Sequence, residues 1–105
     1  LGLAPDAWSL AYQSRFGRAR WLQPYTSETL ATLARDGTRS VDVICPAFAA
    51  DCLETLEEMA VENRAVFIDN GGTQYRFIAC LNDRDDHLRM LRQLIDHSGC
   101  IVDAP

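Results

Sequence analysis

The hydrophobic positions of this chain of 105 residues alternate between short apolar runs and longer amphipathic stretches. Residues 6–12 form an apolar run suited to a buried strand of a parallel sheet. Residues 41–45 are rich in β-branched side chains and end at Pro46, and residues 75–80 are mostly apolar, so both predict strands. Residues 13–25 have no hydrophobic period and contain three arginines, so we expect a loop there.

Amphipathic stretches predict three helices. The first starts at a cap in residues 26–27 and closes at Gly37. The second starts at Asp51. Residues 65–68 could form a strand, but the helical phase continues through them, and we expect one helix that runs to the glycine pair at 71–72. The positions expected on its inward face recur at spacings of three or four and are Leu53, Leu56, Ala60, Asn63 and Phe67.

The third predicted helix begins with acidic residues, which suit the positive end of a helix dipole: Asp83, Asp85 and Asp86. Its expected inward residues are Leu88, Leu91, Leu94 and Ile95. The order strand, loop, helix, strand, helix, strand, helix predicts an α/β fold with a parallel sheet and right-handed crossovers. Such a sheet has few strands for its helices and leaves edges exposed, so we expect a partial domain of a larger protein.

Composition narrows the class of protein. Ten arginines, no lysine and fifteen acidic residues give a net charge of −5, which argues against a nucleic-acid or anionic-membrane binder. No apolar run is long enough to span a bilayer. No secretory signal is visible at the start of the chain, and we expect a cytoplasmic protein.

The four cysteines are spaced at intervals of 7, 28 and 20 residues and are Cys45, Cys52, Cys80 and Cys100. This spacing fits neither a zinc ribbon nor an iron–sulfur cluster, and we expect reduced thiols. The two histidines, His87 and His97, lie in the last predicted helix away from the other motifs. We expect both at the surface.

Five acidic residues and no base fall within residues 51–62. Three of them, Glu54, Glu58 and Glu62, follow one another at steps of four and are called the acidic row below. On an α-helix their carboxylates form one line with a rise of ~6 Å between neighbours. Because no base offsets the repulsion, the row predicts either a well-solvated helix face or a track for divalent cations, which oxygen ligands suit.

Several segments resemble the ferrochelatases of Gram-negative bacteria. They are YQSRFG at 12–17, WLQPYT at 21–26, CPAFAADCLETLEE at 45–58, and the pairs Gly71-Gly72 and Leu81-Asn82. The resemblance implies a Rossmann-like, chelatase-like parallel sheet with flanking helices. It implies that residues 1–105 are the later part of the carboxy-terminal half of a two-lobed lyase. The implied activity is insertion of ferrous iron into protoporphyrin IX to form haem, with the isolated fragment inactive.

The same resemblance implies roles for the acidic row. Glu54 matches the essential acid that faces the porphyrin centre, where it serves catalysis and metal transfer. Glu58 and Glu62 match acidic positions that guide metal or protons along a helix with a π-type widening, a feature that tends to mark functional sites. Whether Glu54 takes up protons or holds the metal stays open.

A porphyrin cleft beside the predicted loop is also implied. Trp21 matches a cleft tryptophan, although from the residues alone it could be a core aromatic. Gln13 and Ser14 match the cleft-side end of a strand, where they would line the site. Cys52 stands where many ferrochelatases have histidine, and we expect it to pack without a catalytic role. The arginines expected to be solvated are Arg15, Arg18 and Arg20.

The implied partners are a porphyrin and ferrous iron, both substrates. No tightly bound cofactor, iron–sulfur cluster, nucleic acid or transmembrane segment is expected, and an unpaired sheet edge predicts self-association of the fragment. Two alternatives stay open: a related chelatase that inserts cobalt or iron into a reduced tetrapyrrole, and a non-catalytic nucleotide-binding or interaction module. Against the second, the chain has no G-x-G-x-x-G or Walker pattern.

Overall fold

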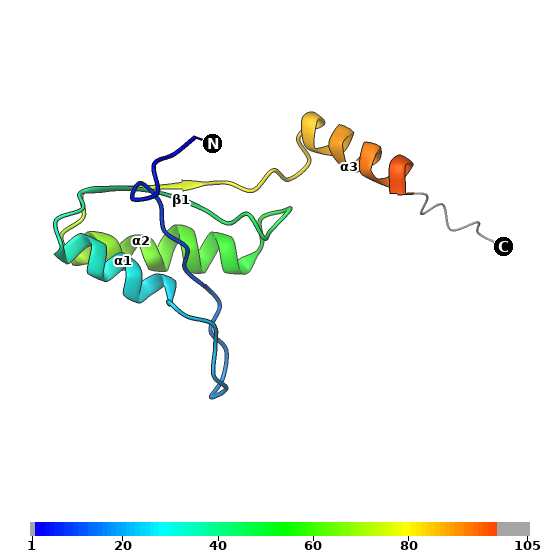
Figure 1. Ribbon diagram of the computed structural model, residues 1–105. Helices are drawn as coiled ribbons and strands as arrows, with labels where there is room; N and C mark the ends of the chain where they lie inside the picture. Colours follow the sequence, from blue (N-terminus) through cyan, green and yellow to red (C-terminus); the bar gives the residue numbers. More distant parts are fainter. Residues whose placement is uncertain (1, 99–105) are drawn as a thin grey trace.

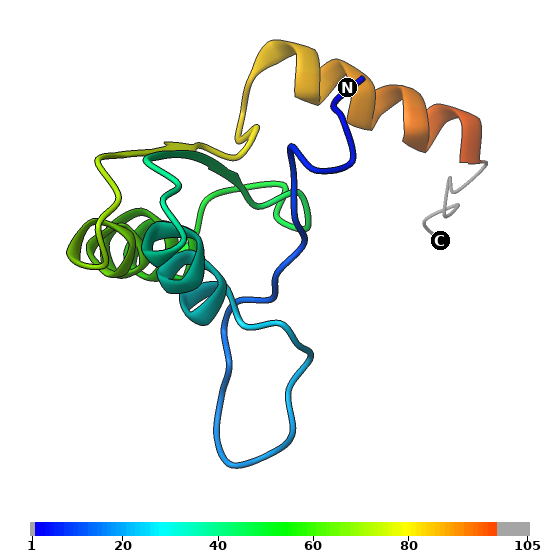
Figure 2. The same ribbon diagram turned by 60° about the vertical axis from the view of Figure 1, so that its left-hand side comes forward.

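The computed structural model describes residues 2–98. Its elements are α1 (Thr26–Arg35), β1 (Ser40–Ile44), the π-helix η1 (Glu54–Glu62), α2 (Asn63–Asp69), β2 (Gln74–Ile78) and α3 (Asp85–Ser98). The two strands pair in parallel, with Ser40 opposite Gln74 and Ile44 opposite Ile78. Figures 1 and 2 show α1 and the continuous helix of η1 and α2 on the same face of these strands. The α/β fold class and the parallel sheet are therefore confirmed, in a small partial domain.

Two glycine-containing turns end the helices as the sequence predicts. After α1, Gly37 has a φ of 99° and donates its N–H to the Ala34 carbonyl at 3.2 Å. After α2, Gly71 has a φ of 110°, and Gly72 donates to the Phe67 carbonyl at 3.0 Å. Only glycine adopts such positive φ values without strain. Each of the two turns therefore directs the chain from its helix back into a strand.

The hydrophobic core lies between the sheet and the two helices. Leu30 and Ala34 of α1 pack with Phe67 of α2, whose side chain is fully buried. Half-buried apolar residues around this cluster are Val41, Val43, Ile68 and Tyr75. A Cβ on Gly72 would lie 2.1 Å from the Phe67 ring, so this close approach requires glycine. The core therefore joins α1 to the second half of the long helix.

The strand predicted for residues 6–12 does not form. The segment is extended and joins the rest through an isolated parallel bridge between Tyr12 and Tyr25. Trp8 and Leu10 are 61% and 58% exposed instead of buried. A central parallel strand needs a neighbour on each side, and in residues 2–98 the sheet consists of β1 and β2, neither of which pairs with this segment.

The second predicted helix forms, but η1 begins at Glu54 and not at Asp51, which lies in the preceding loop and binds Asn82. Its expected inward face is also wrong at Leu53 and Leu56, which are 72% and 52% exposed. The buried positions follow one another at steps of four and are Thr55, Met59, Asn63 and Phe67. The reason is the π-helical first half, in which hydrogen bonds close over five residues instead of four. A face of such a helix repeats at a wider spacing than the α-helical 3.6 residues.

The third helix forms, but it extends away from the sheet and the other helices (Figures 1 and 2). Its expected inward residues are instead 37–59% exposed and are Leu88, Leu91, Leu94 and Ile95. The amphipathic pattern identifies a helix, but burial of its apolar side also needs an opposing surface. The surface prediction is wrong for His87, which is 6% exposed and folds back so that its Nδ1 lies 2.7 Å from the Asn82 carbonyl. It is confirmed for His97.

Three cysteines in the described residues have free thiols, as predicted: Cys45, Cys52 and Cys80. Cys100 lies outside the described residues. Within residues 2–98, no helix combines the length and the apolar character needed to cross a bilayer.

Candidate functional site

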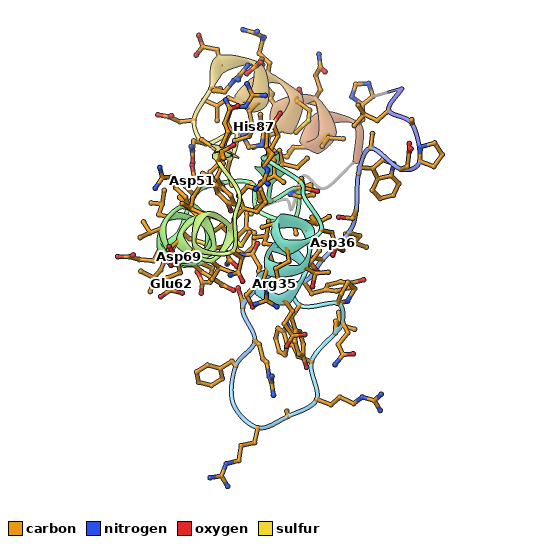
Figure 3. All side chains as sticks on the ribbon, turned by 90° about the vertical axis from the view of Figure 1, so that its left-hand side faces the viewer. Arg35, Asp36, Asp51, Glu62, Asp69 and His87 are labelled. Atoms are coloured by element: carbon orange, nitrogen blue, oxygen red, sulfur yellow. The ribbon has the colours of Figure 1, made fainter. Side chains whose placement is uncertain are left out.

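The carboxyl ends of both strands and the start of η1 meet at one edge of the sheet. Cys45 directly follows β1, Cys80 lies just beyond β2, and Asp51 lies in the loop that leads into η1. Cys80 donates its N–H to Asp51 Oδ1 at 3.3 Å, which joins the two loops. In parallel sheets, ligand sites form outside the carboxyl ends of the strands, and we therefore place the candidate site here. Figure 3 shows Asp51 and His87 towards the start of α3, and Glu62 on the outer side of the long helix.

Gln13 connects three parts of this edge. Its Nε2 donates to the Glu54 carbonyl at 3.2 Å, and its Oε1 accepts from the Cys45 thiol at 3.1 Å. The Gln13 carbonyl accepts the indole N–H of Trp21 at 2.9 Å. The residue therefore ties the loop that carries Trp21 to the end of β1 and to the first turn of η1.

Ser14 binds the middle of the acidic row. Its N–H and its hydroxyl donate to the two carboxylate oxygens of Glu58, at 2.6 Å and 2.9 Å. Ser14 has a φ of 62°, an unusual conformation for a residue with a side chain, and these two hydrogen bonds help to hold it. Both oxygens of Glu58 are thus occupied by the loop, and a cation that binds Glu58 competes with Ser14.

Glu54 differs from Glu58 because its carboxylate is exposed to solvent. The pKa of Glu54 is lowered, first by a hydrogen bond from the Cys52 thiol and second by the backbone N–H of Glu54 itself. Both donors favour the ionised form. Glu54 therefore presents a carboxylate whose backbone is fixed by Gln13 and whose oxygens remain accessible.

The acidic row does not form a chelate. Within residues 2–98, no group of three or more histidine, cysteine, aspartate or glutamate side chains could jointly hold a metal ion. Glu62 is exposed at the end of η1, and Glu54 and Glu58 differ in their partners. In the described residues the row is thus a series of separate carboxylates.

Asp51 is a structural carboxylate at the same edge. Its Oδ2 accepts from Asn82 Nδ2 at 2.9 Å, and its Oδ1 accepts from the Thr55 hydroxyl at 3.0 Å. In return, Asp51 N–H donates to Asn82 Oδ1 at 2.8 Å. These bonds, that from Asn82 first, lower the pKa of Asp51. The pair fixes the loop before η1 relative to the loop after β2.

Two thiols at this edge have raised pKa values. Burial raises the pKa of Cys45 to about 11, with further increases from the nearby carboxylates of Asp51 and Glu58. Burial also raises the pKa of Cys80 to about 11, together with its hydrogen bond to Asp51. Because both pKa values lie well above 7, both residues are neutral thiols at pH 7.

The loop carrying Trp21 is largely open to solvent. Trp21 is 36% exposed and, with Arg20 and Leu22, lines an open hollow of about 450 Å³. The solvated state expected for the three arginines of this loop is confirmed. One of them, Arg15, also places its guanidinium carbon 4.9 Å from the centroid of the Tyr25 ring.

The structure brings together Gln13, Ser14, Glu54 and Glu58, and links Trp21 to them through the Gln13 carbonyl. It leaves Glu62 apart on the outer side of η1 (Figure 3). Sequence reasoning missed four residues that hold this edge, which are Cys45, Asp51, Thr55 and Asn82. All four lie within or beside the quoted motifs, but their hydrogen bonds span up to 32 positions and leave no periodic signal.

Fold and site together define a class: an α/β domain with a parallel sheet and an exposed glutamate at its carboxyl edge. A family model described as ferrochelatase matches residues 1–98, and the chain belongs to the ferrochelatase family.

Three curated relatives illustrate the similarity. A ferrochelatase of Vibrio parahaemolyticus serotype O3:K6 is 53% identical over 95 residues, which are 90% of this chain and 30% of that protein. One from Azoarcus sp. strain BH72 is 56% identical over 95 residues, 90% of this chain and 26% of that protein. One from Aromatoleum aromaticum is 54% identical over 106 residues, 100% of this chain and 29% of that protein.

The chain thus spans less than a third of the length of these relatives. No solved structure matches it.

Proposed function

We propose that this chain is part of an enzyme, a lyase, that inserts Fe²⁺ into protoporphyrin IX to form haem. Residues 1–105 would be the later part of the carboxy-terminal half of a two-lobed ferrochelatase. One observation carries the proposal: this chain, which belongs to the ferrochelatase family, presents the exposed, ionised carboxylate of Glu54 at the carboxyl edge of its sheet. The curated relatives, all named ferrochelatase, support the same activity.

The proposed reaction is an exchange of cations at the centre of the macrocycle. Two pyrrole N–H protons leave the porphyrin, and Fe²⁺ exchanges its water ligands for the pyrrole nitrogens. A carboxylate at the ring centre can accept those protons or receive the incoming ion. The lowered pKa of Glu54 makes it a weaker base but keeps it charged at pH 7, which favours the role of receiving the cation.

Glu58 and Glu62 extend the proposed path for cations away from Glu54. Glu62 is exposed and would meet a hydrated ion first. Glu58 holds Ser14 through both carboxylate oxygens, so a cation that reaches it weakens those two hydrogen bonds. In this proposal Glu58 couples the passage of a cation to the loop that carries Trp21.

The porphyrin would lie against the loop side of the site. The Trp21 indole offers an apolar face for the macrocycle, and Gln13 and Ser14 hold the loop beside Glu54. Fe²⁺ and porphyrin are both substrates, and we expect the enzyme to work in the cytoplasm without a resident cofactor.

The test is metal insertion by the full-length enzyme. Purified protein should convert Fe²⁺ and protoporphyrin IX to haem, followed by the change in porphyrin absorbance. Insertion of cobalt or iron only into a reduced tetrapyrrole would favour the related chelatase. Thermal stabilisation by nucleotides and not by porphyrins would favour a binding module and contradict the proposal.

The isolated 105-residue chain provides a second test. It lacks most of the length of its relatives, so we expect no Fe²⁺ or Zn²⁺ insertion above background. The exposed edges of its two-stranded sheet should also lead to self-association, measured by light scattering. Activity in this chain, or a stable monomer at high concentration, would contradict the respective expectation.

A further inference from the structure

The long helix changes from π-helical to α-helical hydrogen bonding at Asn63. The Asn63 N–H donates to the Glu58 carbonyl, five residues back, and not to the Met59 carbonyl that an α-helix would use. The side chain of Asn63 repeats this choice, because its Nδ2 also donates to the Glu58 carbonyl, at 2.9 Å. The backbone and the side chain of Asn63 thus both bind the carbonyl oxygen of Glu58, the residue whose carboxylate holds Ser14.

The carbonyl left over by this change has its own partner. Met59 O accepts the hydroxyl of Tyr75 on β2 at 2.7 Å. Burial raises the pKa of Tyr75 to about 12, so its hydroxyl stays protonated and remains a donor. Two side chains therefore satisfy the two carbonyls at the junction, and the wide turn does not depend on backbone hydrogen bonds alone.

Asn63 is an unfavourable residue for this buried position because one of its polar atoms has no hydrogen-bond partner. It is 3% exposed, and its Oδ1 is the one buried side-chain acceptor in residues 2–98 without a hydrogen-bond donor. A buried acceptor without a partner destabilises the folded state, whereas an apolar side chain of similar size would not. The amide donor thus supports the wide turn, whereas the unpaired amide oxygen lowers stability.

We propose that Asn63 is a positioning residue that keeps η1 in its π-helical register and thereby sets the direction of Glu54 and Glu58. If the wide turns became α-helical, each residue before Asn63 would rotate about the helix axis relative to the core. The Glu58 carboxylate would then lose Ser14, and the Glu54 carbonyl would lose Gln13. The effect on catalysis rests on the proposed function, but the effect on helix register does not.

Two substitutions in the full-length enzyme separate the donor of Asn63 from its unpaired acceptor. Asn63→Leu removes both, and Asn63→Asp keeps the acceptor but lacks the amide donor. We expect both to lower kcat by about 10- to 100-fold, with the KM for porphyrin within about two-fold, because misplaced groups weaken the chemical step. The melting temperature of the aspartate variant should fall further than that of the leucine variant, because only aspartate keeps an unpaired buried acceptor.

Asn70 provides a matched control, because its Nδ2 donates to the Val66 carbonyl at 2.8 Å, at the α-helical end of the same helix. Asn70→Leu should lower the melting temperature, since the Arg35 Nε–H bond to Asn70 Oδ1 is also lost, and should leave kcat unchanged. A crystal structure of the Asn63→Leu enzyme should show the N–H of residue 63 bonded to the Met59 carbonyl.

Two results would overturn the inference: an unchanged π register in Asn63→Leu, or an unchanged kcat in that variant. The register result decides the question even if the wild-type enzyme proves not to insert Fe²⁺. If the leucine variant does not fold, the register and kcat of Asn63→Asp decide it.

Discussion

The two halves of the long helix are held in different ways. In α2, Phe67 is fully buried against Leu30 of α1 and leaves room at Gly72 only for a hydrogen atom. In η1, Leu56 and Val61 are more than half exposed, and the turns are held by hydrogen bonds from residues elsewhere in the chain. Packing tolerates small rotations of a helix, whereas directional bonds do not. The half that carries the acidic row is thus held by the contacts that fix orientation.

The strongest test of this contrast compares two acids of η1. Glu54→Gln in the full-length enzyme should lower kcat by at least ~100-fold, the scale of a lost acid–base or charge-stabilising group. Porphyrin binding, measured by fluorescence quenching, should stay nearly intact, because in the proposed site apolar contacts hold the ring. The side chains of Glu54 and of Glu57, the second acid, are both exposed, so replacing either with glutamine should leave stability unchanged.

Glu57→Gln is the control, because it changes the net charge equally on the same helix but lies off the line of the acidic row. Its kcat should stay within a few-fold of the wild type, as for a surface acid. Equal losses of kcat at the two positions, or full activity without the Glu54 carboxylate, would show that the acidic row is only a solvated helix face.

The α2 half should respond in stability and not in chemistry. In Gly72→Ala the new Cβ would lie 2.1 Å from the Phe67 ring, so we expect a loss of about 1–3 kcal/mol. The measurement is thermal unfolding, with kcat of the folded enzyme unchanged. Phe67→Leu in the same chain should recover part of the loss, since it opens space at that ring. A Gly72→Ala enzyme as stable as wild type would show that the helix shifts freely.

The link between Ser14 and Glu58 should show as non-additivity. Glu58→Gln should lower kcat by about 10-fold, between the effects at 54 and 57, because hydrogen bonds to a charged group are stronger than neutral ones. Its effect should depend on metal concentration if the row conveys cations. Ser14→Ala should have little further effect once Glu58 is changed, a coupling of about 1–2 kcal/mol. Independent effects of the two changes would mean that Glu58 acts without the loop.

The smallest expected effect is the change in stability at acidic pH. Hydrogen bonds from Asn82, Cys80 and Thr55 lower the pKa of Asp51, so the folded state binds a proton there less readily than the unfolded state. Its stabilisation is therefore complete above the unfolded value of about 4 and is lost as pH falls through the lower folded value. The melting temperature of Asp51→Asn should lie below wild type at pH 7, and the two should converge as the pH falls through the lowered pKa of folded Asp51. A difference that is independent of pH would contradict this.

Short sequence patterns predicted the structural elements that depend only on neighbouring residues. The β-branched run at 41–45 and the glycines after α1 and α2 are read within a few residues, and the structure confirms them. The cap predicted at 26–27 is wrong: α1 begins at Thr26, its N-cap is Tyr25, and no side chain caps it, because Tyr25 keeps the extended conformation of its bridge to Tyr12. The family, too, follows from contiguous motifs.

Tertiary structure alone decided the faces and the contacts. The steps of four from Thr55 to Phe67 depend on a π register that side chains of Asn63 and Tyr75 support, so α-helical spacing misplaced Leu53 and Leu56. Burial of His87 and the bonds of Gln13 to Cys45 and Glu54 join positions that no periodicity relates. A sequence determines where a helix can form from its own turns, whereas the direction of a side chain depends on the distant groups that bind it.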